Sequence, residues 1–184
     1  MRTGWMIGVG VLGLGLGAGL AGAQTFDFGL FDGQWDNITF GSSGPASLLV
    51  EDMGADVVGM NLDLDGGVFG GGDPDPVQLT GTMAGDVFTL DALVGHPTYG
   101  DVSGGVDAGG ALSFDLVGAN DGAFALVTLR GSAVGNSIQF DYEIFTGADD
   151  VPFAVGEVNM RLVPAPGAVT LAGIGGLLFV RRWR

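Results

Sequence analysis

Met60-Asn61-Leu62-Asp63-Leu64-Asp65 is the stretch that decides the fold, because apolar and polar side chains alternate along it without a break. Successive side chains of a β-strand point to opposite faces, so this pattern predicts a strand with one buried and one wet face. The same alternation recurs at Phe114-Asp115-Leu116, Phe140-Asp141-Tyr142 and Val158-Asn159-Met160. From Phe26 to Leu162 no segment has the period of an amphipathic helix, which indicates an all-β domain.

Short turn sequences separate the alternating runs. They are Ala84-Gly85-Asp86, Asp107-Ala108-Gly109-Gly110, Asn120-Asp121-Gly122 and Gly135-Asn136. Gly, Asn and Asp tolerate the positive φ that tight hairpins require, and the 37 glycines of the chain agree with many such turns. We therefore predict an antiparallel meander of about ten strands, which closes into a barrel or folds into a sandwich of two sheets.

Charge is distributed unevenly along the chain. All 21 acidic residues lie between Asp27 and Glu157, where only Arg130 and Arg161 oppose them, so this region has a net charge of −19. Lys is absent, and a surface that neutralises phosphates cannot be built, which excludes nucleic acid as a partner. The acidity favours solubility and mutual repulsion outside the cell, with binding of divalent cations as the alternative.

The first 23 residues have the layout of a secretory signal peptide. Arg2 gives a positive start, residues 4–20 are almost entirely apolar or Gly, and Ala21-Gly22-Ala23 supplies a small-x-small cleavage site. We expect the translocon and signal peptidase as partners, and a mature chain that begins at Gln24. An uncleaved anchor is the alternative, because the apolar run approaches the roughly 20 residues that span a bilayer.

Residues 164–184 form a second signal, built from three blocks. Pro164-Ala165-Pro166-Gly167 is followed by an apolar stretch from Ala168 to Val180 and then by Arg181-Arg182-Trp183-Arg184. At ~1.5 Å per residue the apolar stretch extends about 20 Å, short of the ~30 Å hydrocarbon core, which suits transient contact with the membrane. Clustered arginines stay on the cytoplasmic side, so the preceding domain is expected outside.

The tail resembles a PEP-CTERM sorting signal, which exosortases process in exopolysaccharide-producing Gram-negative bacteria. Val163-Pro164-Ala165-Pro166 stands where that family usually has Val-Pro-Glu-Pro, with Ala165 in place of the Glu. The resemblance is confined to this tail. It implies an exosortase-like sorting enzyme, exopolysaccharide as a partner, and delivery to the cell envelope, the outer surface or the extracellular matrix. An ordinary short anchor is the alternative.

The two signals divide the chain into three parts. We expect a signal peptide over residues 1–23, a β-rich extracellular domain over 24–163 and a sorting tail over 164–184. A signal helix then precedes the β-domain and a hydrophobic helix follows it.

A calcium loop is one candidate site within the domain. Asn61, Asp63 and Asp65, followed by Gly66, match the opening of an EF-hand loop, but its twelfth position is Gly72 instead of the bidentate Glu. A hairpin with an acidic outer face is the favoured interpretation. The candidate calcium ligands are Asn61, Asp63 and Asp65, with Asp73 and Asp75 as further oxygen donors.

Catalytic patterns are sparse. The single histidine, His96, precedes Pro97 in a predicted turn, and no Gly-x-Ser-x-Gly sequence accompanies it, which favours a solvated turn residue over a triad member. Pairs of carboxylates that hydrolyse a glycoside will also arise by chance among 18 Asp and three Glu.

These observations predict a non-catalytic structural or adhesive β-domain that needs no cofactor. A lipocalin-like barrel that binds a small ligand or a glycan is the first alternative, because Gly33-Gln34-Trp35 resembles the Gly-x-Trp of the first lipocalin strand. A carboxylate-dependent enzyme on matrix polysaccharide is the second. A deep apolar cavity favours the binding barrel, a cleft with two close carboxylates favours the enzyme, and a filled core favours the structural role.

The tail predicts two different failures of sorting. Replacing Arg181, Arg182 and Arg184 by neutral residues is expected to remove the cytoplasmic stop, so that the chain escapes unprocessed to the medium. Replacing Pro164 and Pro166 is expected to leave it membrane-held and uncut, because the apolar segment and its charges remain. Fractionation with tail-specific and domain-specific antibodies distinguishes the two, and a mature wild-type protein that keeps its tail would refute the sorting interpretation.

Overall fold

The computed structural model describes residues 27–68, 72–147 and 151–164. These residues form eleven β-strands and no helix, and none of them belongs to a helix long and apolar enough to span a membrane. The strands are β1 (Gly29–Asn37), β2 (Ser42–Gly54), β3 (Val57–Leu64), β4 (Val77–Ala84), β5 (Val87–Leu90), β6 (Leu93–His96), β7 (Gly100–Val106), β8 (Ala111–Ala119), β9 (Phe124–Val134), β10 (Ser137–Phe145) and β11 (Ala154–Leu162). Strands that follow one another pair antiparallel, with one exception, so the predicted meander is confirmed.

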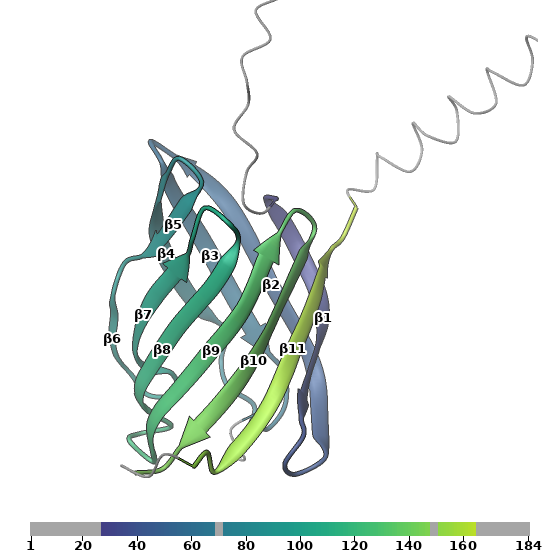
Figure 1. Ribbon diagram of the computed structural model, residues 1–184, viewed down its shortest axis with the longest axis vertical. Helices are drawn as coiled ribbons and strands as arrows, with labels where there is room; N and C mark the ends of the chain where they lie inside the picture. Colours follow the sequence, from purple (N-terminus) through teal and green to yellow (C-terminus); the bar gives the residue numbers. More distant parts are fainter. Residues whose placement is uncertain (1–26, 69–71, 148–150, 165–184) are drawn as a thin grey trace, which may run out of the picture.

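Two pairings between strands that are not consecutive close the sheet into a barrel. The first strand pairs with the last, from Phe31 opposite Leu162 to Asn37 opposite Gly156. The exception to the meander is β5, which pairs with β7 at Phe88 opposite Val106, leaving β6 outside the ring. The result is a closed ring of ten strands (Figure 1), so of the two predicted architectures the barrel is the one found.

The barrel has two distinct ends. We call the end where β1 begins and β11 finishes the termini end, and the opposite one the loop end (Figure 1). The loop end carries the connections between β3 and β4 and between β10 and β11. The predicted signal helix and the predicted tail helix lie outside the described residues.

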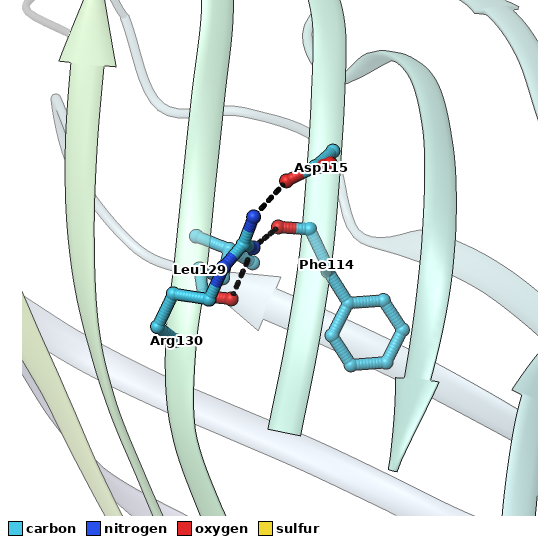
Figure 2. Close-up of polar contacts among 4 residues, drawn as sticks. All are labelled: Phe114, Asp115, Leu129 and Arg130. Carbon is cyan, nitrogen blue, oxygen red and sulfur yellow. Dashed lines mark hydrogen bonds and ion pairs between the residues drawn. The ribbon is translucent and has the colours of Figure 1, made fainter. Parts of the chain in front are cut away.

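In most strands alternation places apolar side chains inside the barrel and mainly polar ones outside. Val158 and Met160 are each 1% exposed inside the barrel, as the sequence pattern predicts. On the outer face, Arg130 of β9 donates to the Asp115 carboxylate of β8 at 2.6 Å and to the Phe114 carbonyl oxygen at 2.6 Å. The Phe114 ring points away from this guanidinium (Figure 2). Phe114 precedes Asp115 on β8, and neighbouring residues of a strand face opposite sides.

Glycines allow neighbouring backbones to approach closely where the sheet bends into a ring. A Cβ atom at Gly33 of β1 would overlap the carbonyl oxygen of Asn159 on β11. At Gly131 of β9 it would overlap the carbonyl oxygen of Gln139 on β10. Closed barrels use such glycine positions to turn their corners, so part of the high glycine content serves closure and not only turns.

All four predicted turns connect consecutive strands as expected, whereas the tight turn between β2 and β3 was not predicted. Asn120 and Asp121 adopt φ of 54° and 52° between β8 and β9. Between β2 and β3 the positive φ values fall on Ala55 and Asp56, at 54° and 63°. Ala seldom adopts this conformation, so residue type alone gives little indication of that turn.

The close approach at Gly33 predicts that a single methyl group disrupts closure. Gly33→Ala is expected to lower the free energy of unfolding by roughly 3 kcal/mol, because the β1 and β11 backbones must separate. Gly147→Ala is the matched control, since a Cβ there meets nothing within 4 Å, and it should change stability by less than about 0.5 kcal/mol. Urea unfolding of both variants measures the difference, and equal midpoints would contradict this account of the bend.

Candidate functional site

The interior of the barrel holds an apolar cavity with a volume of about 110 Å³. Eight strands and the turn before β7 contribute its walls. Its lining residues are Leu48, Met60, Leu62, Leu64, Val77, Leu79, Tyr99, Val102, Val106, Leu112, Phe114, Leu116, Leu129, Ala133, Ile138, Phe140 and Met160. Tyr99 is the one member of this set with a polar side-chain atom. Walls of this kind favour apolar over polar occupants.

Several residues of a single strand line the cavity. Alternate residues of β8 line it from Leu112 to Leu116, a separation of about 13 Å along the strand at ~3.3 Å per residue. Several side chains that face it are only half-buried although they point inward, among them Leu62, Leu129 and Phe140. Free space therefore lies beside these side chains and suits a small apolar occupant.

Trp35 closes the loop end of the barrel and does not line the cavity. Its side chain is 1% exposed, and its indole Nε1 donates to the Asp65 carbonyl oxygen at 2.8 Å. Gly66 packs against the ring, where a Cβ would lie 3.6 Å from it. In the Gly33-Gln34-Trp35 motif, Gly33 allows β1 and β11 to approach each other closely, and Trp35 closes the end of the barrel.

Tyr99 forms the loop-end wall of the cavity and is 3% exposed. Burial, together with the nearby negative charges of Asp63 and Asp73, raises its pKa to about 12. The phenol is therefore protonated and uncharged across the physiological range. The cavity presents no ionised group to an occupant at this end.

His96 stabilises the turn that positions Tyr99. Its Nδ1 accepts hydrogen bonds from the backbone N–H groups of Thr98 and Tyr99, at 3.3 and 3.2 Å. Its ring centre lies 5.1 Å from that of Tyr99. The prediction of a turn residue agrees with this geometry, except that His96 is half-buried and bonded instead of freely solvated.

The candidate calcium residues lie at the loop end of β3. Asn61 and Asp63 are on the outer face of the strand and Asp65 follows its last residue. Burial, followed by repulsion from Asp65 and Asp73, raises the pKa of the Asp63 carboxyl. Asp73 accepts from the Gly66 N–H at 2.7 Å, so it fixes the turn. Within the described ranges, no three acidic or histidine side chains form a group that holds a metal ion.

A polar groove of about 260 Å³ crosses the outer face of β9, β10 and β11. Asp141 of β10 lies directly opposite Glu157 of β11 and, on its other side, opposite Arg130 of β9. The structure thus places these two carboxylates at facing positions of neighbouring strands. The groove lies on the open wall of the barrel, and Asp141 is exposed to solvent.

The predicted sorting motif begins where the barrel ends. The Val163 N–H donates to the Leu30 carbonyl oxygen at 2.7 Å, and Pro164 follows it, exposed. The remaining residues of the two predicted signals lie outside the described residues; they are Ala21, Ala23, Ala165, Pro166, Arg181, Arg182 and Arg184.

Sequence reasoning found the inward-facing residues but not the space between them. It also missed the break between β5 and β6, although the positions of the inward-facing residues indicate it. Phe88 and Leu90 face inward at even positions, whereas Leu93 packs on the core at an odd one.

No protein-family model, curated protein or solved structure matches this chain. The cavity is therefore the observation on which a proposal of function has to rest.

The loop-end carboxylates predict little response to calcium. Asp73 is engaged with the backbone and the candidate loop lacks its closing Glu, so melting curves with calcium and with chelator are expected to coincide within about 1 °C. Differential scanning calorimetry measures this. A rise of many degrees at micromolar calcium would contradict it and would make Asp63 and Asp65 the first residues to replace.

Proposed function

We propose that the barrel binds a small apolar molecule in its interior. The observation that carries this proposal is the cavity inside the barrel, whose walls are apolar except for the uncharged Tyr99. Transfer of hydrocarbon from water into such a space is favourable by about 0.8 kcal/mol per CH₂ group. Ionic or strongly polar molecules have no partner there, so the chemistry of the walls selects for hydrocarbon.

The volume limits what the cavity holds. At about 110 Å³ it is smaller than the roughly 300–1,000 Å³ of pockets that enclose a drug-sized ligand. A short alkyl chain or a single small ring fits, and any larger part of the ligand stays outside. Met60 and Met160 lie in the wall, and their flexible thioethers allow it to adapt to a longer chain.

We propose that this binding takes place where export and sorting deliver the domain. The predicted signal peptide over residues 1–23 and the tail that resembles a PEP-CTERM signal support a domain that acts at the cell surface or in the exopolysaccharide matrix. We propose a non-catalytic carrier or sensor of apolar molecules there, without a cofactor.

Two other functions each have one observation in their favour. Phe40 and Phe153 are 61% and 52% exposed at the loop end, with ring centres 5.5 Å apart, and such a pair suits a structural or adhesive contact. Asp141 opposite Glu157 suits hydrolysis of a polysaccharide. The open wall around that pair offers little exclusion of water, which makes the enzyme the weaker of the two.

Filling the cavity is expected to abolish binding. Ala133 lines the cavity, and Ala133→Leu places an isopropyl group inside it, whereas Ala111→Leu makes the same change on the exposed start of β8. Titration with a fluorescent hydrophobic probe should give at least a tenfold weaker Kd for Ala133→Leu and an unchanged Kd for Ala111→Leu.

Near-UV circular dichroism of both variants checks that the barrel is intact, since overpacking costs about 1–3 kcal/mol. Native mass spectrometry of the wild-type protein tests for a hydrophobic molecule that copurifies. If Ala133→Leu is folded and binds the probe like the wild type, the ligand does not occupy the cavity. The structural or adhesive role is then favoured.

A further inference from the structure

The barrel wall is interrupted between β4 and β6. β4 pairs with β3 along Val77–Thr82, but with β5 only from Gly81 to Ala84. β6 pairs with β7 alone. Within the described residues, Val77–Leu79 therefore has no strand partner on its second side. We call this interval, between Val77–Leu79 and Leu93–His96, the seam.

One pair of residues joins the two sides of the seam at the end nearer β5. The Asp91 N–H donates to the Thr80 carbonyl oxygen at 2.8 Å, and the Thr80 hydroxyl donates to the Asp91 carboxylate at 3.0 Å. Both residues are exposed. These two bonds join β4 to the start of the chain that leads into β6.

β6 is also attached to β7 by an irregular ladder. Leu93 pairs with Val102 and His96 with Gly100, with a shift of register between them. The Gly95 N–H donates to the Asp101 carboxylate at 2.6 Å and not to a strand carbonyl. A short strand with one irregular ladder opens at lower free energy than strands paired on both sides.

The seam leads directly to the cavity. Val77 and Leu79 of β4 line the cavity on one side of the interruption, and Val102 of β7 lines it on the other. β6 is the element that lies between them and covers this part of the wall, beside β7 (Figure 1). An apolar chain that passes the seam thus meets cavity walls at once.

The border of the seam is acidic. Asp91 and Asp101 are exposed along it, and Asp75 is exposed just before β4 begins. His96 is the basic side chain on β6, and its Nδ1 accepts two backbone N–H groups. The arginines of the described residues, Arg130 and Arg161, stand on β9 and β11, on strands that adjoin neither β4 nor β6.

We propose that the seam is the entrance to the cavity, and that its acidic border selects apolar chains whose head group is uncharged or cationic. This rests on the proposed function, since it names the ligand class and the route for the same cavity. The chain occupies the apolar interior and the head group remains at the seam beside Asp91. A carboxylate or phosphate head is repelled there, whereas a hydroxyl is tolerated and an ammonium is attracted.

Head-group selection is tested with three probes of equal chain length, 1-decanol, decylamine and decanoate, on the purified full-length protein. At low salt, decanoate is expected to bind at least tenfold more weakly than decanol, and decylamine more tightly than decanol. The differences should shrink as ionic strength rises, because exposed charges are screened. Asp91→Asn should reduce the preference for decylamine severalfold, and Asp141→Asn, on the remote β10, should leave it unchanged.

The route is tested by exchange rates. Thr80→Val removes the side-chain bond across the seam, whereas Thr82→Val changes the same face of β4 opposite Thr89 of β5. Stopped-flow mixing should show severalfold faster association and release for Thr80→Val at an unchanged Kd, and wild-type rates for Thr82→Val. The chain has no cysteine, so a Gln78→Cys/Val94→Cys pair bridged by a short bis-maleimide should slow exchange at least tenfold. A bridged Ser47→Cys/Asp63→Cys pair, across β2 and β3, is the control.

The outcomes separate the two proposals. Binding of no probe by the wild-type protein refutes the proposed function, and the entrance with it. Binding that prefers decanoate, or rates that neither Thr80→Val nor the bridged seam alters, refutes the entrance and its selectivity while the binding barrel stands.

Discussion

The pairing of β1 with β11 brings the first strand of the domain against the last, and the interior exists only because of it. Each strand carries one apolar face, and an open sheet would expose these faces together with two unpaired edges. Closure places the large Trp35 beside Val158 and the small Gly33 beside Met160. The sizes of these facing residues therefore specify how the two strands fit together. At the opposite side of the ring closure is slight, since β5 and β7 share only the pairs of Phe88 with Val106 and Thr89 with Gly105.

The number of strands explains why closure leaves a cavity. A ring of about eight strands is just filled by its own side chains, and the interior widens as strands are added. Ten strands enclose more space than their Leu, Val, Met and Phe residues occupy, and about 110 Å³ remains. Trp35 and Tyr99 close the loop end. The Trp35 indole N–H is directed to the Asp65 carbonyl oxygen, and the raised pKa of Tyr99 keeps its phenol uncharged.

The large excess of acidic residues has a structural use apart from solubility. Several carboxylates accept backbone N–H groups at turns and irregular strand ends, where no ladder partner is present. Asp52 accepts from Gly54, Asp73 from Gly66, Asp101 from Gly95, and Asp107 from both Gly109 and Ala111, at 2.6 to 2.8 Å. In two of these cases, Asp52 with Gly54 and Asp107 with Gly109, the short Asp side chain reaches the backbone two residues on.

Local features of this protein follow from its sequence alone. Alternation at Met60-Asn61-Leu62-Asp63-Leu64 determined which side chains face inward, and Asn120-Asp121-Gly122 determined a turn, because both depend on neighbours along the chain. The choice between barrel and sandwich was decided by contacts of β1 with β11 and of β5 with β7, which no local pattern encodes. The cavity and the seam were also decided by the tertiary structure. The cavity is the space that remains when all interior side chains are packed, and the seam exists because Val77–Leu79 and β6 form no backbone pairing.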